Sequence, residues 1–222
     1  MKCVVVVSPH PDDETLGCGG TLLKHRQEGD VVHWVIMTEM KEELGYSKSD
    51  LVTRKKEIEK VTNLYEFKTV TNFEFPTTQM DRHPLSEIIG KLNGTFSKLK
   101  PEILYVPFGS DVHTDHQITF QAISSATKSF RHPYIKRILS YEVLSETEFN
   151  LDPSNSSFKP TVFIDIMNTL EKKLKIMDLY RSEIDFSPFP RSREAIRALA
   201  IFRGSTAGVQ YAESFILLKE IL

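Results

Sequence analysis

The feature that most constrains the fold of this chain is a run of apolar, mostly β-branched side chains at residues 3–7, which predicts a buried strand. Residues 8–14 follow it immediately and contain one histidine and three acids, His10, Asp12, Asp13 and Glu14. Four titratable side chains at the carboxyl end of a buried strand are costly to hold there unless a charge balances them. A divalent cation is the obvious candidate, so we expect this turn to form part of a metal site.

Strand and helix patterns alternate along the whole chain. We expect strands at residues 3–7, 31–37, 69–73, 103–106, 137–141 and 161–165. We expect helices at residues 15–28, 51–65 (with Asp50 as N-cap), 85–99, 116–130, 169–180 and 191–202. Residues 212–222 are amphipathic and fit either a helix or a strand. The βαβα order predicts an α/β fold with a Rossmann-like, doubly wound, mostly parallel sheet.

Length and composition exclude several classes of protein. The 222 residues fit one domain spanning 1–222, in which the less regular part, 145–222, is expected to wall a pocket. The net charge of −2 provides no electrostatic reason to expect nucleic acid as a partner. No apolar run reaches the length of about 20 residues that a transmembrane helix needs. Two cysteines form no disulfide framework and predict a cytoplasmic location. The sequence leaves open whether the protein forms a homo-oligomer.

A second polar cluster, residues 111–116, follows the strand expected at 103–106 as the first cluster follows the strand at 3–7. In the common doubly wound strand order 3-2-1-4-5, strands one and four are neighbours. Ligands bind in the crevice outside their carboxyl ends, where the connection changes direction. We therefore expect the two clusters to meet and to form the active site there.

The residue types in the two clusters suit a catalytic metal. His10 and Asp13 are three residues apart, as are His113 and His116, so the members of each pair can reach one point. Imidazole and carboxylate ligands favour Zn²⁺ or Fe²⁺, and two histidines with one carboxylate leave a position open for water. A carboxylate off the metal could accept the proton of that water, and a histidine off the metal could stabilise an oxyanion. Whether Asp12 or Asp13 binds the metal stays open at this point.

Other interpretations of the same residues are weaker. An acidic run alone is usually a solvated helix N-terminus, and a lone His-x-x-His often arises by chance. Residues 17–22 lack the third glycine of a dinucleotide-binding fingerprint, and the chain has neither a phosphate-binding loop nor a nucleophile elbow. Cys18 is better explained as a small packing residue than as a nucleophile.

The motif at residues 9–14 together with His113-Thr114-Asp115-His116 resembles the PIG-L/LmbE-like family of metal-dependent N-acetyl-sugar deacetylases. Residues 54–57 are similar to the family's Arg-x-x-Glu helix, and residues 203–215 to the ending seen in its bacterial thiol-pathway branch. The resemblance covers most of the chain and implies an LmbE-like fold. The metal ligands that it implies are His10, Asp13 and His116.

The same resemblance implies roles for the remaining polar residues. Asp12 would be the general base, His113 would bind the oxyanion and protonate the leaving amine, and Asp115 would orient or tune His113. The residues expected to bind substrate are Arg54, Asp111 and Arg203, the last together with Arg191 and Arg193 where the sugar carries a phosphate or nucleotide. The alternative for Arg54 is an exposed helix charge, and for each C-terminal arginine it is a surface charge or a salt bridge. Glu14 receives no role beyond stabilising the helix N-terminus or supporting the site.

These observations predict a zinc-dependent hydrolase that removes acetyl from an N-acetylated amino sugar, with Fe²⁺ as the alternative metal. The expected partner is a small N-acetyl amino sugar or its glycolipid or nucleotide conjugate. Residues 75–80 carry threonines where many relatives have an acid that binds sugar hydroxyls, which leaves the exact sugar open. The alternatives are hydrolysis of another bond and a non-catalytic module that binds sugar or nucleotide.

Overall fold

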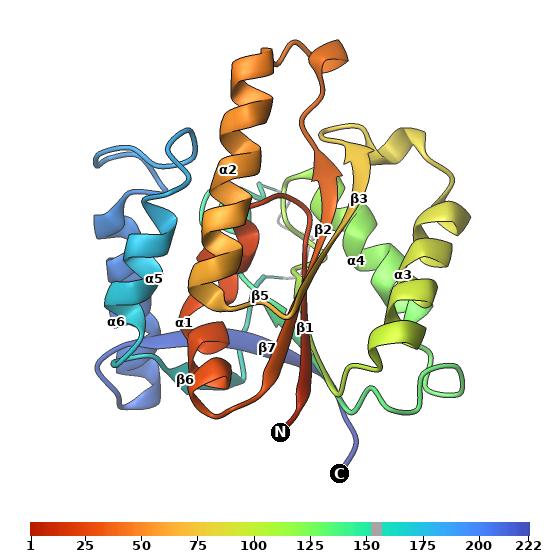
Figure 1. The fold of residues 1–222 in the computed structure, drawn as a ribbon. Coiled ribbons are helices and arrows are strands. Elements are labelled where there is room, and N and C mark those ends of the chain that lie inside the picture. Colours follow the sequence, from red (N-terminus) through yellow and green to blue (C-terminus); the bar gives the residue numbers. More distant parts are fainter. Residues whose placement is uncertain (152–156) are drawn as a thin grey trace.

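The computed structural model describes residues 1–151 and 157–222, which include a seven-stranded sheet flanked by helices (Figure 1). The strands are β1 (Cys3–Ser8), β2 (Val31–Glu39), β3 (Thr69–Pro76), β4 (Ile103–Pro107), β5 (Arg137–Tyr141), β6 (Val162–Asp165) and β7 (Ala212–Glu220). The α-helices are α1 (Asp13–Gln27), α2 (Lys48–Tyr65), α3 (Leu85–Leu99), α4 (Thr114–Ala126), α5 (Leu170–Met177) and α6 (Arg193–Ala207). Short 3₁₀ turns lie at Glu42–Leu44 and Met80–Arg82.

The strand order is β3-β2-β1-β4-β5-β7-β6, so the expected order over the first five strands is confirmed. These five strands pair in parallel, whereas β7 runs antiparallel to both β5 and β6. The stretch at residues 212–222, open between helix and strand, is the strand β7. Part of the loop expected at 145–159 lies outside the described residues. Among the described residues, no helix has the length and apolar character of a membrane span.

Strand β1 is buried on both of its faces, as its continuous apolar sequence predicts. Val4 and Val6 belong to the core under α1, α2, α5 and α6, whereas Val5 and Val7 belong to the core under α3 and α4 (Figure 1). Each fully buried valine contributes about 1.5–3 kcal/mol of hydrophobic stabilisation. The polar turn that follows β1 therefore begins at a rigid point in the middle of the sheet.

Helix α2 begins three residues earlier than predicted. Ser47, not Asp50, is the N-cap, and its hydroxyl accepts the backbone N–H of Asp50. Asp50 is the third helical residue, and its carboxylate accepts the backbone N–H of Ser47 in return. The two residues form a capping box, in which an acidic residue at this position is as favourable as one at the N-cap itself.

Helix α1 is kinked at Cys18, where the backbone leaves the helical region (φ −146°, ψ 20°). The buried carboxylate of Glu213 on β7 accepts the free N–H groups of Gly20 and Thr21 beyond the kink, at 2.8 and 2.7 Å. Lys173 on α5 donates to the carbonyl of Leu16 before the kink and to Glu213. A buried ion pair from the C-terminal part thus completes the hydrogen bonds that the kink interrupts.

We predict that Glu213→Ala destabilises the protein by about 3 kcal/mol, because it leaves the Lys173 ammonium and two helix N–H groups buried without a partner. Urea unfolding followed by circular dichroism measures the change. Glu220→Ala, on the same strand but exposed, is the control and should change the free energy of unfolding by less than about 0.5 kcal/mol. Equal effects of both substitutions would show that Glu213 does not support the kink.

Candidate active site

The turns after β1 and β4 meet at the carboxyl ends of these two neighbouring strands. His10 lies in the first turn, and His113 is the N-cap of α4, which also carries His116 in its first turn. The ring centroid of His10 lies 4.5 Å from that of His113 and 5.3 Å from that of His116. The two polar clusters, a hundred residues apart in the sequence, therefore form one site as the strand order predicts.

Three side chains in this site point potential ligand atoms at one another. Asp13 Oδ2 lies 3.6 Å from His10 Nδ1 and 3.4 Å from His116 Nε2. His116 Nε2 is buried and makes no hydrogen bond. The three residues are close enough to hold one metal ion. The spacing of the residues leaves Asp12 and Asp13 open and the family resemblance implies Asp13, which is the one in this cluster.

The second nitrogen of each histidine contacts a carboxylate. His116 Nδ1 donates to Asp111 Oδ2 at 2.9 Å, and His10 Nε2 donates to Asp115 Oδ2 at 3.0 Å. Metal-binding histidines almost always donate their other N–H in this way, which fixes the ring and leaves the ligand nitrogen free. The unpaired Nε2 of His116 and these two carboxylates fit a Zn²⁺-type or Fe²⁺-type ion bound by His10, Asp13 and His116.

The ionisation of these groups shows that the site attracts positive charge. Burial by itself raises the pKa of Asp13, but His116 and His10 outweigh it and lower the pKa to about 2. Burial by itself lowers the pKa of His116, but Asp13 and Asp111 raise it well above its usual value. A site that draws a proton onto a fully buried histidine favours a cation at the same position.

Asp111 does not have the expected position of a substrate-binding residue. It is fully buried, and its carboxylate accepts from His116 Nδ1 and, at 2.6 Å, from the hydroxyl of Thr147. It does not line the cavity that contains the candidate ligands. Asp111 therefore holds the ring of His116 from behind, through the hydrogen bond to Nδ1, and does not face the space in which a substrate would lie.

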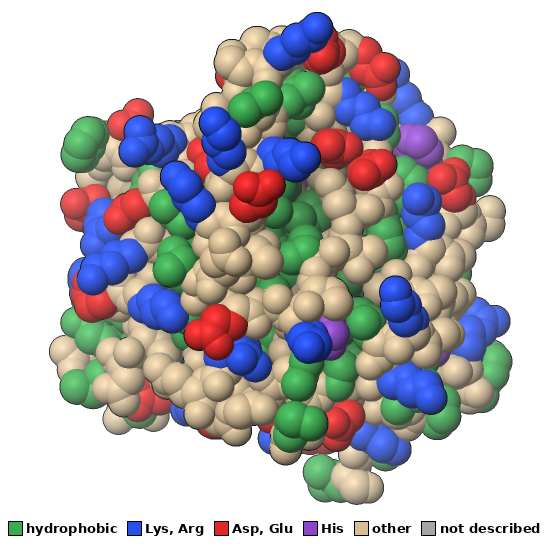
Figure 2. All heavy atoms as spheres, viewed as in Figure 1, with side chains coloured by type: hydrophobic (Ala, Val, Ile, Leu, Met, Phe, Trp, Pro, Cys, Tyr) green, Lys and Arg blue, Asp and Glu red, His purple; other side chains and the backbone are tan. Residues whose placement is uncertain are grey.

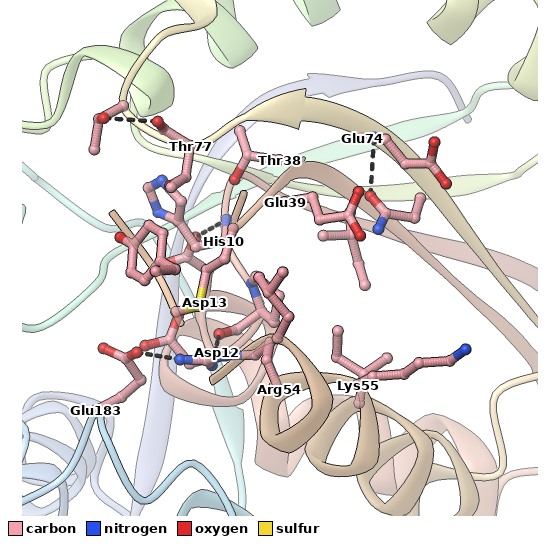
Figure 3. Close-up of a pocket in the computed structure, with 18 of the residues that line it drawn as sticks. His10, Asp12, Asp13, Thr38, Glu39, Arg54, Lys55, Glu74, Thr77 and Glu183 are labelled. Atoms are coloured by element: carbon pink, nitrogen blue, oxygen red, sulfur yellow. Dashed lines mark hydrogen bonds and ion pairs between the residues drawn. The ribbon is translucent and has the colours of Figure 1, made fainter. Parts of the chain in front are cut away.

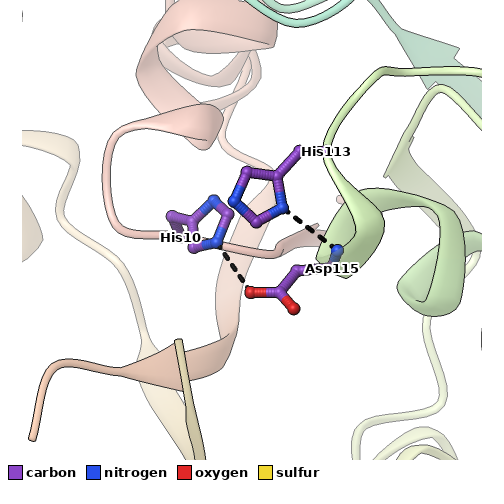
Figure 4. Close-up of side chains that lie close together, drawn as sticks. All are labelled: His10, His113 and Asp115. Atoms are coloured by element: carbon purple, nitrogen blue, oxygen red, sulfur yellow. Dashed lines mark hydrogen bonds and ion pairs between the residues drawn. The ribbon is translucent and has the colours of Figure 1, made fainter. Parts of the chain in front are cut away.

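Asp115 contacts His10 rather than orienting His113 through its carboxylate (Figure 4). Its two oxygens also accept the backbone N–H groups of Thr78 and Met80, at 2.7 and 3.2 Å. Only the backbone N–H of Asp115 contacts His113, donating to Nδ1 at 3.1 Å. Asp115 thus orients His113 through its peptide group, and its carboxylate opposes the effect of burial on the pKa of His113 by raising it and also holds the ring of His10.

His113 is held as a neutral donor. Because Nδ1 accepts a backbone hydrogen bond, the ring proton of the neutral form resides on Nε2. Burial and the neighbouring rings of His10 and His116 lower the pKa of His113 to about 4. The residue lines the cavity beside His10 and is suited to donate a hydrogen bond to a substrate oxygen there.

Asp12 sits beside the ligand cluster in a strained backbone conformation, with φ at 132°. Its side chain is buried in the cavity wall, 3.6 Å from a guanidinium nitrogen of Arg191 (Figure 3). Burial, Asp13 and Glu183 raise the pKa of Asp12 well above its usual value. A carboxyl group with a raised pKa next to a metal site has the properties of a general base.

Glu14, which sequence analysis leaves without a role, holds Asp12 in place. It is fully buried, and its Oε2 accepts the backbone N–H of Asp12 at 3.0 Å. Its Oε1 accepts the hydroxyls of Thr15 and Tyr180, at 2.6 and 2.8 Å. Burial raises the pKa of Glu14 to about 7 despite these hydrogen bonds. The strained turn is thus tied both to α1 and to the chain after α5.

Arg54 lines the cavity, so the alternative of an exposed helix charge is wrong for it. It donates to the carbonyl of Pro11 at 3.0 Å and pairs with Glu183, which crosses to the site from the C-terminal part (Figure 3). Glu183 has no signal in the sequence, because it lies in an irregular segment that only the tertiary fold brings to Arg54. Glu146, Thr77 and Thr78 also line the cavity. The two threonines belong to the loop 75–80, at which the sequence leaves the sugar contact open, and Glu146 belongs to the part, 145–222, that was expected to wall a pocket.

Arg203 does not line this cavity, and its expected role in binding substrate is corrected. Its guanidinium forms two hydrogen bonds with Glu142, at 2.8 and 2.6 Å, and lies over the ring of Phe158. Arg193 pairs with Asp178 on the surface. Of the three C-terminal arginines, Arg191 is the one that lines the cavity.

Fold and site define a doubly wound α/β protein with a candidate mononuclear metal centre. The family model described as "PIG-L: GlcNAc-PI de-N-acetylase" matches residues 5–127, and the chain belongs to this family. It is 26% identical to the diacetylchitobiose deacetylase of Thermococcus kodakarensis, over 96% of this chain and 82% of the relative. It is also 26% identical to a probable N-acetyl-alpha-D-glucosaminyl L-malate deacetylase 2 of Bacillus anthracis, over 81% and 80% of the two chains.

Solved structures show the same fold. The N,N'-diacetylchitobiose deacetylase of Pyrococcus horikoshii aligns with a TM-score of 0.77 at 26% identity, over 97% of this chain and 83% of that one. A 4-carboxy-2-hydroxymuconate hydratase of Pseudomonas putida aligns with the same TM-score at 16% identity, over 100% and 98%. Because proteins with different named reactions share the fold, the function has to be argued from the site.

We predict that Asp111→Asn weakens metal binding by about 10–100-fold, because the carboxylate that holds His116 Nδ1 is lost. Competition with a chromophoric chelator measures the affinity for Zn²⁺. Glu142→Gln, which changes a partly buried acid outside the cavity, is the control and should bind Zn²⁺ like the unmodified protein. If the Asp111 variant had an unchanged affinity for Zn²⁺ but a raised KM, this would show instead that Asp111 contacts the substrate.

Proposed function

We propose that this protein is a metal-dependent deacetylase that hydrolyses the acetamido group of an N-acetylated amino sugar, releasing acetate and a free amine. The observation that carries the proposal is that potential ligand atoms of His10, Asp13 and His116 lie together, two of the three residues being buried, while Asp12 lies beside this trio and is not part of it. The names of the relatives support the substrate class, since both act on N-acetylglucosamine-containing compounds. Zn²⁺ is the proposed metal, with Fe²⁺ as the alternative.

Each residue of the site has a separate role in amide hydrolysis. His10, Asp13 and His116 would hold a divalent ion, which would supply polarisation of the acetyl carbonyl and a lowered pKa of water. Asp12 accepts a proton from the attacking water, and its raised pKa matches it to that task. Asp12 then delivers the same proton to the leaving nitrogen, so the amine departs neutral and the carboxylate is restored.

His113 acts on the other side of the scissile bond. Its Nε2–H donates a hydrogen bond to the carbonyl oxygen as negative charge develops there. The lowered pKa of His113 supports this role over protonation of the leaving amine, because the ring stays neutral. Glu14 and Asp115 are positioning residues, since each holds a neighbour by hydrogen bonds and the positions of Asp12 and His10 depend on them.

Arg54, Arg191 and Glu183 form a charged wall next to Asp12, and we propose that Arg54 and Arg191 bind the sugar hydroxyls there. Guanidinium groups suit this role because their donors keep a fixed geometry.

The two cysteines are free in the structure, which is consistent with the cytoplasmic location expected for the protein.

We predict that Asp12→Asn retains bound Zn²⁺ but lowers kcat by about 10²–10⁴-fold, because the general base is lost while the ligand trio stays intact. His116→Ala should lose the metal and the activity together. Metal content is measured by elemental analysis, and turnover by release of acetate and free amine from a panel of N-acetyl amino sugars. Lys48→Ala, at the exposed start of α2, is the control and should change neither.

Three outcomes of this experiment would contradict the proposal. Normal turnover by the Asp12 variant would remove its role as base. Phosphate release from sugar phosphates without acetate release from any acetamide would indicate a hydrolase of another bond. Sugar binding of full affinity in the metal-free protein, without turnover in the loaded one, would indicate a binding module.

A further inference from the structure

The cavity that contains the candidate active site continues well beyond it. Its volume is about 580 Å³, within the range of pockets that enclose a drug-sized ligand. The end at His10 and Asp12 is polar (Figure 3), whereas several apolar side chains line the opposite part, between α2 and the edge of the sheet formed by β2 and β3. The apolar residues lining it are Ile36, Met40, Tyr46, Leu51, Val52, Ile58 and Val70.

This apolar end, which we call the α2 pocket, exists because helix α2 covers the sheet with only its C-terminal half. Val61 and Tyr65 are fully buried in the core there. Leu51 and Val52, toward the N-terminal end, face the cavity instead, and Val52 is 53% exposed. From Leu51 to Ile58 the helix extends by about 10 Å, which is the length of the wall that it provides.

The floor of the α2 pocket is the face of the sheet that α2 would otherwise cover. Side chains alternate along a strand, so Ile36, Thr38 and Met40 lie on one face of β2 and its C-terminal continuation, and the lining residues of β3 are Val70, Asn72 and Glu74. The apolar part of this floor is Ile36, Met40 and Val70. Parallel sheets are ordinarily covered by helices on both faces. Here apolar side chains of a helix and a sheet instead face each other across open space (Figure 2).

The charges at the mouth of the α2 pocket narrow the class of ligand. Glu39 and Glu74 lie at the ends of β2 and β3, with Lys55 of α2 opposite them (Figure 3). Two exposed carboxylates against one ammonium disfavour an anion, such as a phosphate or a dicarboxylate. The apolar walls favour an alkyl, acyl or aryl group, since each buried methylene contributes about 0.8 kcal/mol.

We propose that the α2 pocket binds an uncharged, apolar aglycone of the amino sugar whose acetamide is hydrolysed at the metal site. The proposal rests on the function proposed above, because one continuous cavity joins the two ends: an acetamide at His10 and Asp13 leaves the rest of the substrate to extend along α2. The structure thus assigns Leu51, Val52, Ile58 and Val70 as specificity-determining residues.

The experiment compares the methyl and octyl glycosides of N-acetylglucosamine, with acetate release measured for each. The octyl glycoside should have a kcat/KM at least about tenfold higher, mainly through KM, because burial of a few methylenes suffices for this gain. Val52→Asp places a charge in the wall and should lower the octyl-to-methyl ratio by about tenfold. Leu64→Asp makes the same change at an exposed position of α2 outside the cavity and should leave the ratio unaltered.

A binding measurement separates failure of this inference from failure of the proposed function. Octyl glucoside has no acetamide and, below its micelle threshold, should bind the metal-free protein and bind the Val52→Asp variant at least about tenfold more weakly. No acetate from either glycoside would overturn the deacetylase function and leave this binding result standing. Acetate from both with equal kcat/KM would overturn the inference alone, as would a dimer in light scattering that Val52→Asp dissociates.

Discussion

The structure depends on the compensation of charge at the carboxyl ends of β1 and β4. His10, Asp13 and His116 point three ligand atoms at one another in a buried place, and Asp111 and Asp115 hold the two rings from outside. Without a cation, the carboxylates raise the pKa of His116 against the effect of burial. Burying these carboxylates and histidines costs free energy, and a positive charge between them offsets that cost. This is the physical basis for a metal centre.

The C-terminal part of the chain supports this site from behind. Glu213 and Lys173 complete the hydrogen bonds at the kink in α1, the helix that begins with Asp13. Tyr180 donates to Glu14, which in turn holds the strained peptide of Asp12. Glu183 and Arg191 close the cavity beside Asp12. The motif residues are therefore local in sequence, but the structure that holds them is not.

Sequence analysis predicted the strand order and the meeting of the two polar clusters. It did not predict which carboxylate contacts which histidine within the site. The strand order followed from hydrophobic periodicity, and it was sufficient to predict that residues 8–14 meet residues 111–116. The roles of Asp111 and Asp115 did not follow. Both are acids within five residues of a histidine, and spacing alone does not show which ring each carboxylate reaches. Arg203 was assigned to substrate by its charge, although Glu142, sixty-one residues away, neutralises it.

By itself, the sequence determined the α/β class, the parallel order of five strands and the residue types at the site, because these depend on local periodicity and on the chemistry of side chains. The family resemblance implied Asp13 rather than Asp12 as the ligand, but only the tertiary structure gave the geometric reason: Asp13 faces both histidines, and the strained backbone angle at Asp12 separates the two side chains. The tertiary structure also decided that half of α2 stands away from the sheet. The packing of a helix depends on every element around it, and no window of the sequence contains that information.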